Sequence, residues 1–329
     1  MKKTKVLLMS FLIITSLNFS KDLPVNKEEY AFKVYDISNI GMGYSKVANK
    51  NKSGMDTNPA TIALLKESYL EIGYSYSDKI DIFSDEMEVN KKIDYLALSS
   101  ATGGFYYKNF SKEGSNSINE KYDFNMKEIG LVITQKSETK NGLNSGLTLK
   151  GYYGNVLEGS LDDNKDIDLV IDRGYGIGID LGFLYKANFV YAGFMWKDIY
   201  SKIFWSEYKD VKINSKLSGG IGFDLGIFSY SISIEKILLD TSSVKYGHGI
   251  EMLILKLPEE YTGYFLKGLE ARLRTGSYGE EIFNGKKRMT YGLEISNKKY
   301  FVNNAITSEK INPFDGEDVL YKASIGMKF

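Results

Sequence analysis

Apolar and polar residues alternate with a period of two along most of the chain after residue 68. Phe228, Tyr230 and Ile232, for example, share one face, and serines occupy the positions between them. Such alternation is typical of β-strands, because successive side chains of a strand point to opposite sides. The pattern predicts about fourteen strands, each near the length that a tilted membrane strand requires. Their expected ranges are 69–76, 92–100, 103–111, 126–137, 143–157, 174–186, 189–198, 214–225, 228–236, 244–256, 262–275, 286–296, 299–308 and 319–329.

The segments between these strands alternate in length. Short gaps at 186–188, 225–228 and 297–298 suit tight turns. Long polar gaps suit exposed loops, and they lie at 77–91, 112–125, 159–173 and 310–318. Membrane barrels have short turns at one end and longer loops at the other. We therefore expect an all-β fold, a transmembrane antiparallel β-barrel of about fourteen strands.

Alternation alone also fits a soluble sheet with one wet face, so the N-terminus is needed to separate the two classes. Lys2, Lys3 and Lys5 precede an apolar run at 6–17. That run is too short to span a bilayer but has the layout of a secretory signal peptide, which we assign to residues 1–20. An exported chain without a helical span is either a soluble protein or a β-barrel.

The last strand favours the barrel. Its apolar face carries Tyr321, Ile325, Met327 and Phe329, and Phe329 is the final residue. A terminal strand that ends in Phe resembles the signal recognised by the outer-membrane barrel-assembly machinery. We therefore expect that machinery and outer-membrane lipid as partners, and the outer membrane of a Gram-negative (diderm) bacterium as the location.

The amino-acid composition argues against several classes of function. The chain has 42 Lys plus Arg and 42 Asp plus Glu, so its charge gives no reason to expect a nucleic-acid partner. It has no cysteine, and one histidine, His248, forms neither a metal site nor a catalytic triad. Asp162, Asn164 and Asp166 begin like a calcium loop, but Ile167 stands where that loop requires Gly. We expect no enzyme, no metal and no cofactor, and a place for His248 in the wall.

Charged residues fall on the polar faces of several strands. Opposite charges on neighbouring strands attract each other and help to fix the register. Both signs occur, so a strongly ion-selective pore is not indicated. We expect these side chains to line the lumen, with a role in ligand binding as the alternative. The expected lumen charges are Asp180, Asp224, Glu235, Glu270, Arg272, Arg274, Arg288 and Glu294.

The segment before the strands has a different character. Asn58 can cap a helix with its side-chain oxygen, and Pro59 then takes the first helical position, where its missing N–H costs nothing. The run from Ala60 to Leu65 adds little more than a turn and a half. Gly41 and Gly43 predict a tight turn upstream. The expected order is therefore a glycine turn, a loop and a short capped helix.

This N-terminal segment resembles that of a known family. Gly41-Met42-Gly43, Val47-Ala48 and Asn58-Pro59-Ala60, followed by a first strand, are similar to the start of the outer-membrane long-chain fatty-acid transporter (FadL) superfamily, which includes PorV-like barrel proteins. The resemblance implies that this segment folds back into the lumen as a hatch and gates the ligand path. The implied gating residues are Gly41, Gly43, Asn58, Pro59 and Ala60. The implied division is a signal peptide at 1–20, a lead and hatch at 21–68, and a barrel at 69–329.

Two functions remain open. A FadL-like barrel passes hydrophobic, fatty-acid-like small molecules across the outer membrane, and its hatch moves on ligand binding. A PorV-like barrel serves as a secretion or surface-anchoring partner and transports no small molecule. An apolar pocket beside the hatch favours the first function, and a large apolar patch on the loops favours the second.

Overall fold

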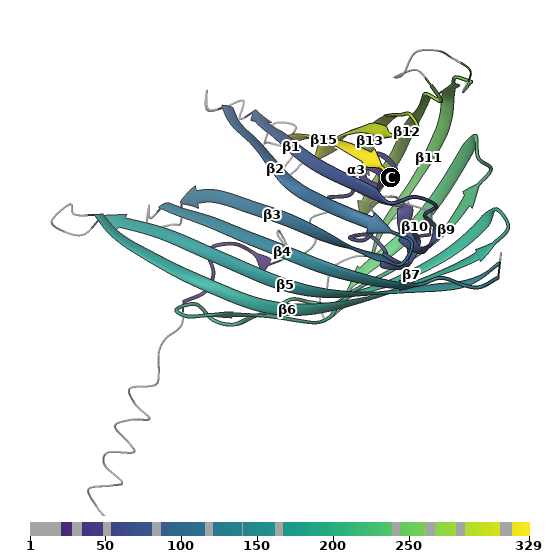
Figure 1. Cartoon of the computed structure of the whole chain (residues 1–329). Helices are drawn as coiled ribbons and strands as arrows, with labels where there is room; N and C mark the ends of the chain where they lie inside the picture. The colour runs from purple at the N-terminus through teal and green to yellow at the C-terminus, as the bar shows by residue number, and fades with distance from the viewer. Residues whose placement is uncertain are drawn as a thin grey trace, which may run out of the picture.

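The computed structural model describes residues 21–27, 35–48, 54–80, 87–115, 121–139, 141–161, 167–238, 244–258, 260, 267–280, 287–309 and 318–329 (Figure 1). Three short helices precede the strands: α3 (Ile37–Gly41) and the 3₁₀ helices η1 (Lys46–Ala48) and η2 (Pro59–Leu64). None of the described helices is long and apolar enough to cross a membrane. The strands are β1 (Tyr69–Ile80), β2 (Met87–Ser100), β3 (Gly103–Ser115), β4 (Lys121–Gln135), β5 (Gly142–Leu161), β6 (Ile167–Ala187), β7 (Val190–Trp205), β8 (Val211–Lys212), β9 (Lys216–Asp224), β10 (Phe228–Ile237), β11 (Lys245–Lys256), β12 (Glu270–Glu280), β13 (Lys287–Ser296), β14 (Tyr300–Glu309) and β15 (Asp318–Lys328).

The strands close into a ring of 14 antiparallel strands, which confirms the predicted fold class. Each strand pairs with its neighbours along the chain, β7 pairs with β9, and β1 pairs with β15 to close the ring. The two-residue β8 lies outside the ring and pairs with β7. Closure continues to the last residue, because the backbone groups of Ser68 and Phe329 exchange hydrogen bonds of 3.0 and 3.1 Å.

Several strands are longer than predicted. Much of the expected loops at 77–91, 112–125 and 159–173 is strand, and β12 lies at 270–280 instead of 262–275. The sequence Ser-Lys-Glu-Gly-Ser that ends β3 shows the reason. Its strand has no apolar face there, so the period-two signal disappears although the ladder with β4 continues. The expected loop at 310–318 and the calcium-like run at 162–166 lie outside the described residues, apart from Asp318, which begins β15.

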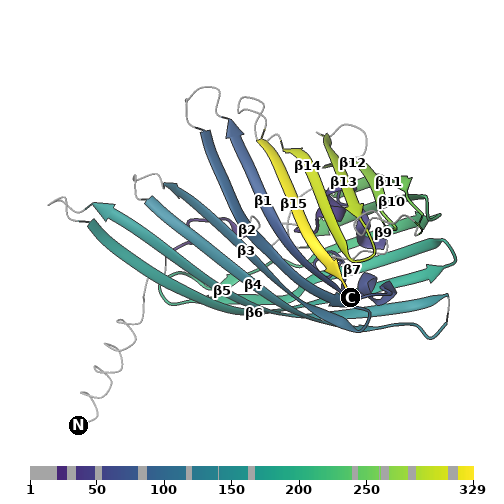
Figure 2. The same ribbon diagram turned by 45° about the horizontal axis from the view of Figure 1, so that its top comes forward.

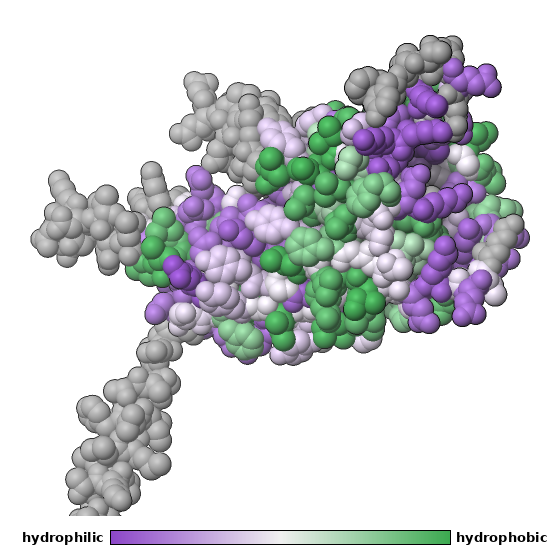
Figure 3. Space-filling view, viewed as in Figure 1, coloured by the Kyte–Doolittle hydropathy of each residue, from purple (hydrophilic) through white to green (hydrophobic). Residues whose placement is uncertain are grey.

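Burial on the strands is inverted relative to a soluble sheet. Apolar side chains such as Ile133 (53% exposed), Ile177 (59%) and Ile325 (59%) point outwards, and Figure 3 shows apolar side chains gathered across the middle of the strands facing the viewer. Charged side chains such as Lys150 and Asp180 are buried on the inward face. An apolar outer band around a polar interior is the layout of a membrane barrel.

The helices lie inside the ring (Figures 1 and 2). Helix α3 packs against β12 to β15, η1 against β7, β9 and β10, and η2 against β2, β4, β5 and β6. We call the barrel end with the two-residue turns at 101–102 and 188–189 and the C-terminal Phe329 the turn end. The opposite end, where β1 and β2, β3 and β4, and β5 and β6 connect, is the loop end.

Candidate functional site

Glycines in the hatch and in the barrel wall allow the two backbones to lie in direct contact. Gly43 has a φ of +63°, and its amide donates to Thr290 Oγ1 at 3.0 Å. A Cβ there would lie 2.6 Å from the His248 and Ser277 carbonyl oxygens, so only glycine fits. Gly41 approaches the wall glycine Gly292 in the same way, with 3.2 Å between its ideal Cβ and the Gly292 Cα.

Asn58 has more contacts than a helix cap requires. Its side-chain oxygen accepts from the Ala60 amide at 3.1 Å, which is the expected cap. Its side-chain nitrogen donates to the Val47 carbonyl oxygen at 2.8 Å and to the Phe183 carbonyl oxygen in β6 at 3.1 Å. Asn58 therefore joins both 3₁₀ helices to the wall. The predicted short capped helix is a 3₁₀ helix of six residues.

Pro59 and Ala60 rest on wall glycines. A Cβ at Gly146 would meet the Ala60 nitrogen at 2.6 Å, and one at Gly182 would meet the Asn58 side-chain oxygen. Pro59 and Ala60 are buried. The structure thus places all five expected hatch residues against the inner face of the barrel.

Asp56 anchors one side of the hatch. Its carboxylate lies 2.7 Å from Lys108 Nζ on β3 and 3.0 Å from Lys197 Nζ on β7. Lys108 also pairs with Glu128 on β4 at 2.9 Å. Burial alone would raise the pKa of the Asp56 carboxyl, but the two ammonium groups outweigh it and hold that pKa well below its usual range. Asp56 therefore stays a carboxylate.

Lys46 anchors the opposite side with the opposite charge. Its Nζ lies 3.3 Å from Glu251 on β11 and 2.6 Å from the Ser38 hydroxyl. Arg274 on β12 bonds both Glu251 and Glu294, so Lys46 joins an existing network. The hatch is thus anchored on opposite sides of the barrel wall, by a negative side chain, Asp56, and a positive side chain, Lys46.

The expected lumen charges fall into four groups. Asp180, Glu235, Arg274 and Glu294 lie in buried or half-buried ion pairs or hydrogen bonds on the inner face. Arg272 and Glu270 pair with each other at 3.4 Å. Asp224 is not part of a described lumen network, because its carboxylate accepts from the Gly226 amide in the turn after β9. Arg288 is half-buried on β13.

The most deeply buried part of the network was predicted only at Asp180. It is a charged belt across the middle of the lumen, made of Asp56, Lys108, Glu128, Lys150, Asp180, Lys197 and Asp198. Lys150 lies between Asp180 and Asp198, which are both fully buried. A Lys or Asp on an alternating strand gives the same sequence pattern whether its side chain is buried or exposed. Only the structure shows that the polar face of these strands points into the barrel and is buried.

Above the belt, towards the loop end, an apolar cluster fills part of the lumen. An aromatic cluster there consists of Phe110, Phe124, Met126, Tyr152, Val156, Ile203, Trp205, Tyr208 and Ile213, with Val25 of the N-terminal segment inserted. Trp205 lies flat on Gly154 and Gly174, where added Cβ atoms would meet its ring at 2.7 Å. A small cavity of about 10 Å³ joins Phe110 and Tyr152 of this cluster to Lys108 and Glu128 of the belt.

The seam between β2 and β3 is incomplete. Their ladder joins only Tyr95–Ser100 to Gly103–Lys108, and nearer the loop end the two strands diverge, as both ribbon views show (Figures 1 and 2). Tyr35 of the hatch lies at the fork. Its hydroxyl donates to the Asn109 carbonyl oxygen at 3.2 Å, and its ring stacks on Tyr95 with centroids 6.2 Å apart. Tyr35 therefore covers the fork from inside.

The remaining predicted positions lie in the wall. His248 on β11 hydrogen-bonds to Ser277 on β12 at 2.8 Å, as expected for a wall residue. On β15, Tyr321 donates to Asn304 at 2.5 Å, and Ile325 and Phe329 are exposed on the outer face together with the half-buried Met327. The expected signal peptide at 1–20 lies outside the described residues.

Comparison with known proteins identifies the fold. No family model matches the sequence, and no curated protein does. Among solved structures, the toluene transporter TbuX of Ralstonia pickettii superposes with a TM-score of 0.61 at 12% identity over 92% of this chain and 100% of its own. The toluene transporter TodX of Pseudomonas putida gives 0.57 at 12% identity over 90% and 98%, and a FadL homologue of Pseudomonas aeruginosa gives 0.55 at 10% identity over 90% and 98%. The chain therefore has the fold of the FadL-type outer-membrane transporters, which confirms at the level of fold the resemblance seen in its N-terminal segment.

Proposed function

We propose that this protein lets hydrophobic small molecules pass passively through the outer membrane of a Gram-negative bacterium. The observation that carries the proposal is the continuity between the aromatic cluster and the incomplete β2–β3 seam. Phe110 belongs to both, since it lies in the cluster and follows directly on Asn109 at the fork. Transport of toluene or other hydrophobic molecules by proteins of the same fold supports the proposal.

The aromatic cluster is the entry site. A hydrophobic molecule arriving at the loop end gains roughly 25 cal/mol for each Å² of apolar surface that it removes from water. Val25 occupies the cluster in this structure, so the incoming molecule displaces it. Residues 1–20 are the signal peptide in this proposal, and residues 21–68 form the lead and hatch.

The charged belt directs the molecule sideways. Passage straight down the lumen requires separation of Asp56 from Lys108 and Lys197, and loss of one partner of a buried ion pair costs about 3–5 kcal/mol. The fork between β2 and β3 offers a route from one apolar environment, the cluster, to another, the bilayer. Movement of Tyr35 opens that route, while Gly41, Gly43, Asn58, Pro59 and Ala60 keep the rest of the hatch seated.

The wall and its assembly follow from the same proposal. Outer-membrane lipid surrounds the apolar outer band, and the barrel-assembly machinery reads the outward face of β15 that ends in Phe329. This proposal requires no catalytic residue, metal or cofactor. The alternative of a secretion or anchoring partner rests on sequence resemblance alone, because no contact among the described residues favours it.

A reversible cross-link tests the seam. The chain has no cysteine, so Ile93→Cys with Asn109→Cys places one thiol on each side of the fork without background reaction. A bis-methanethiosulfonate linker should abolish uptake of toluene into proteoliposomes, and a reducing agent should restore it. The matched control is Leu131→Cys with Leu149→Cys, two exposed residues that face each other across the intact β4–β5 ladder. Equal uptake before and after cross-linking at the fork would exclude the lateral route.

A further inference from the structure

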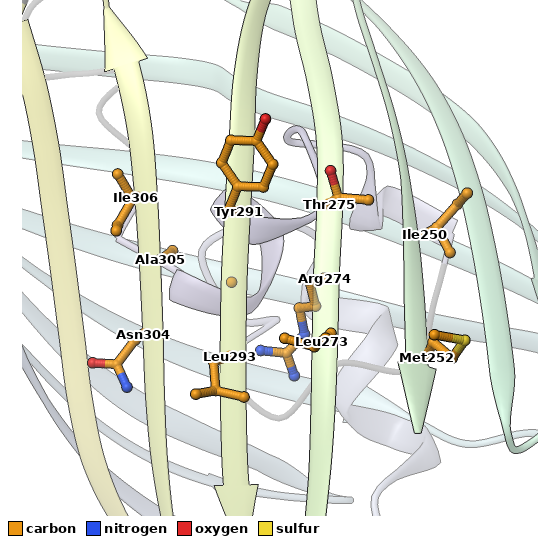
Figure 4. Close-up of a pocket in the computed structure, with 11 residues that line it drawn as sticks. Ile250, Met252, Leu273, Arg274, Thr275, Tyr291, Leu293, Asn304, Ala305 and Ile306 are labelled. Atoms are coloured by element: carbon orange, nitrogen blue, oxygen red, sulfur yellow. The ribbon is translucent and has the colours of Figure 1, made fainter. Parts of the chain in front are cut away.

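A second apolar feature lies on the outside of the barrel, away from the seam. It is a groove of about 560 Å³ that crosses β11 to β14 (Figure 4). Its sides are formed by Ile250 and Met252 on β11, Leu273 on β12, Tyr291 and Leu293 on β13, and Ile306 on β14. Ligand pockets in proteins typically measure about 300–1,000 Å³, so the groove has the size of a binding site.

The groove has no connection to the lumen. The β12–β13 and β13–β14 ladders behind it are regular, with Leu273 opposite Leu293 and Tyr291 opposite Ile306, and the register shift of the β11–β12 ladder lies beyond Met252, between Leu253 and Leu255. Behind Gly292 lies the hatch residue Gly41, in backbone contact with the wall. Arg274 also borders the groove, but its guanidinium turns inwards to Glu251 and Glu294. A molecule in the lumen therefore cannot enter the groove, and only the surrounding membrane can supply an occupant.

The lining changes character along the strands. Tyr291 and Thr275 present hydroxyl groups at the end of the groove nearer the loop end of the barrel, as Figure 4 shows. Met252, Leu273 and Leu293 form an aliphatic floor towards the turn end. Met adapts its shape to an apolar partner because it has several rotatable bonds and a polarisable sulfur. The side-chain oxygen of the bordering Asn304 already accepts from Tyr321.

We infer that this groove binds one acyl chain of an outer-membrane lipid. The polar end of the lipid lies beside the Tyr291 and Thr275 hydroxyls, and the methyl end of the chain lies along Met252, Leu273 and Leu293. Because Gly292 separates the groove from Gly41 by one backbone thickness, the bound chain supports the wall on which α3 rests. This lipid site is independent of the transport route proposed above.

Native mass spectrometry of the full chain in mild detergent tests the inference. After exchange into micelles that contain palmitoyl-oleoyl phosphatidylethanolamine, the unmodified protein should keep one bound lipid. Leu273→Trp and Ile306→Trp each put an indole into the groove and should lose that adduct. The control is Ile325→Trp, on the outer face of β15 and outside the groove, which should keep it. An adduct that survives in both groove variants, or one that is lost in the control as well, overturns the proposal.

A second measurement does not depend on lipid retention in the gas phase. Tyr291→Trp places a fluorophore at the rim, and lipids brominated on the acyl chain quench nearby indoles. After subtraction of the signal from Trp196 and Trp205, quenching of Tyr291→Trp should saturate at a lower fraction of brominated lipid than quenching of Ile325→Trp. Identical quenching curves for the two variants would show that Tyr291 contacts only bulk lipid and would refute a binding site. Far-UV circular dichroism confirms that each variant is folded.

Discussion

Two seams of the same barrel begin with turns of equal length and end differently. The turn at 101–102 leads into the β2–β3 seam, whose ladder stops at Tyr95 and Lys108. The turn at 188–189 leads into the β6–β7 seam, whose ladder continues to Gly174 and Trp205 near the loop end. A tight turn therefore starts a ladder but does not set its length.

Side-chain chemistry explains the difference. In the β6–β7 seam, Gly174 makes room for the Trp205 ring, and the two strands stay together over a sealed apolar contact. In the β2–β3 seam, the diverging segments Met87–Asp94 and Asn109–Ser115 contain several Lys, Asp and Glu residues and few large apolar ones. A strand edge that carries charges resists pairing with another edge. The β6–β7 seam is therefore closed where Gly174 packs against the Trp205 ring. The β2–β3 seam is open where the strand edges are rich in charged residues.

Removal of the hatch should have the largest effect on passage through the barrel. Deletion of residues 41–65 removes η1, η2 and the anchors Lys46 and Asp56 from the lumen of the 14-strand ring. A barrel of that size encloses more space than its wall side chains fill, so we expect continuous current in planar bilayers where the parent is closed. Slower gel migration after boiling than before shows that the variant is folded. A folded deletion variant with the conductance of the parent would show that the hatch is not the plug.

Loss of Asp56 should have the next largest effect on passage. Its carboxylate joins β3 of the β2–β3 seam to β7 of the β6–β7 seam. Asp56→Ala leaves Lys108 on β3 and Lys197 on β7 without this carboxylate. Removal of one partner from a buried ion pair costs about 3–5 kcal/mol. We expect faster hydrogen exchange in residues 54–65 and a measurable leak. Asp224→Ala is the matched control, since among the described residues its carboxylate accepts a hydrogen bond from the Gly226 amide in a turn, and equal effects of the two changes would contradict the anchor.

The same anchor predicts little pH dependence above pH 4. The pKa of Asp56 is lowered in the folded state, so its contribution to stability is present above the unfolded pKa of about 3.9 and is lost as pH falls towards the folded value. Acidification from pH 7 to about pH 4 therefore should not release the hatch through this group. Conductance that rises within that interval in the parent and not in Asp56→Ala would contradict this assignment.

The smallest effect is expected at the fork itself. Tyr35→Phe removes only the hydroxyl that bonds Asn109, and a hydrogen bond of this kind contributes about 0.5–1.5 kcal/mol. The ring remains on Tyr95, so we expect a modest rise in toluene uptake and no rise in ion conductance. Tyr69→Phe removes a hydroxyl that bonds Glu67, away from the fork, and should leave uptake unchanged. Lower uptake in Tyr35→Phe would mean that the hydroxyl assists passage.

The sequence predicted the parts of this fold that depend on local periodicity. Strands such as β10 have one apolar and one polar face, and the capped turn at Asn58 needs only its own residues. Contacts between residues far apart in the sequence could not be predicted in this way. Asp56 lies in a polar turn and Lys46 at the start of η1, and their partners on β3, β7 and β11 are far away in the sequence. The charges at the β2–β3 fork were read as parts of the exposed loops at 77–91 and 112–125, although both diverging strands stay paired on their other sides.

The pairing of Ser68 with Phe329 constrains the order of assembly. Ser68 lies at the end of the hatch segment and Phe329 directly follows β15, so the ring cannot close before β15 has been synthesised and exported. Closing it joins segments separated by nearly the whole barrel sequence, which is slow because long-range contacts form late in folding. The contacts of the hatch anchors Asp56 and Lys46 with β7 and β11 join parts of the chain that precede β15, so they can form while the sheet is still an open trough.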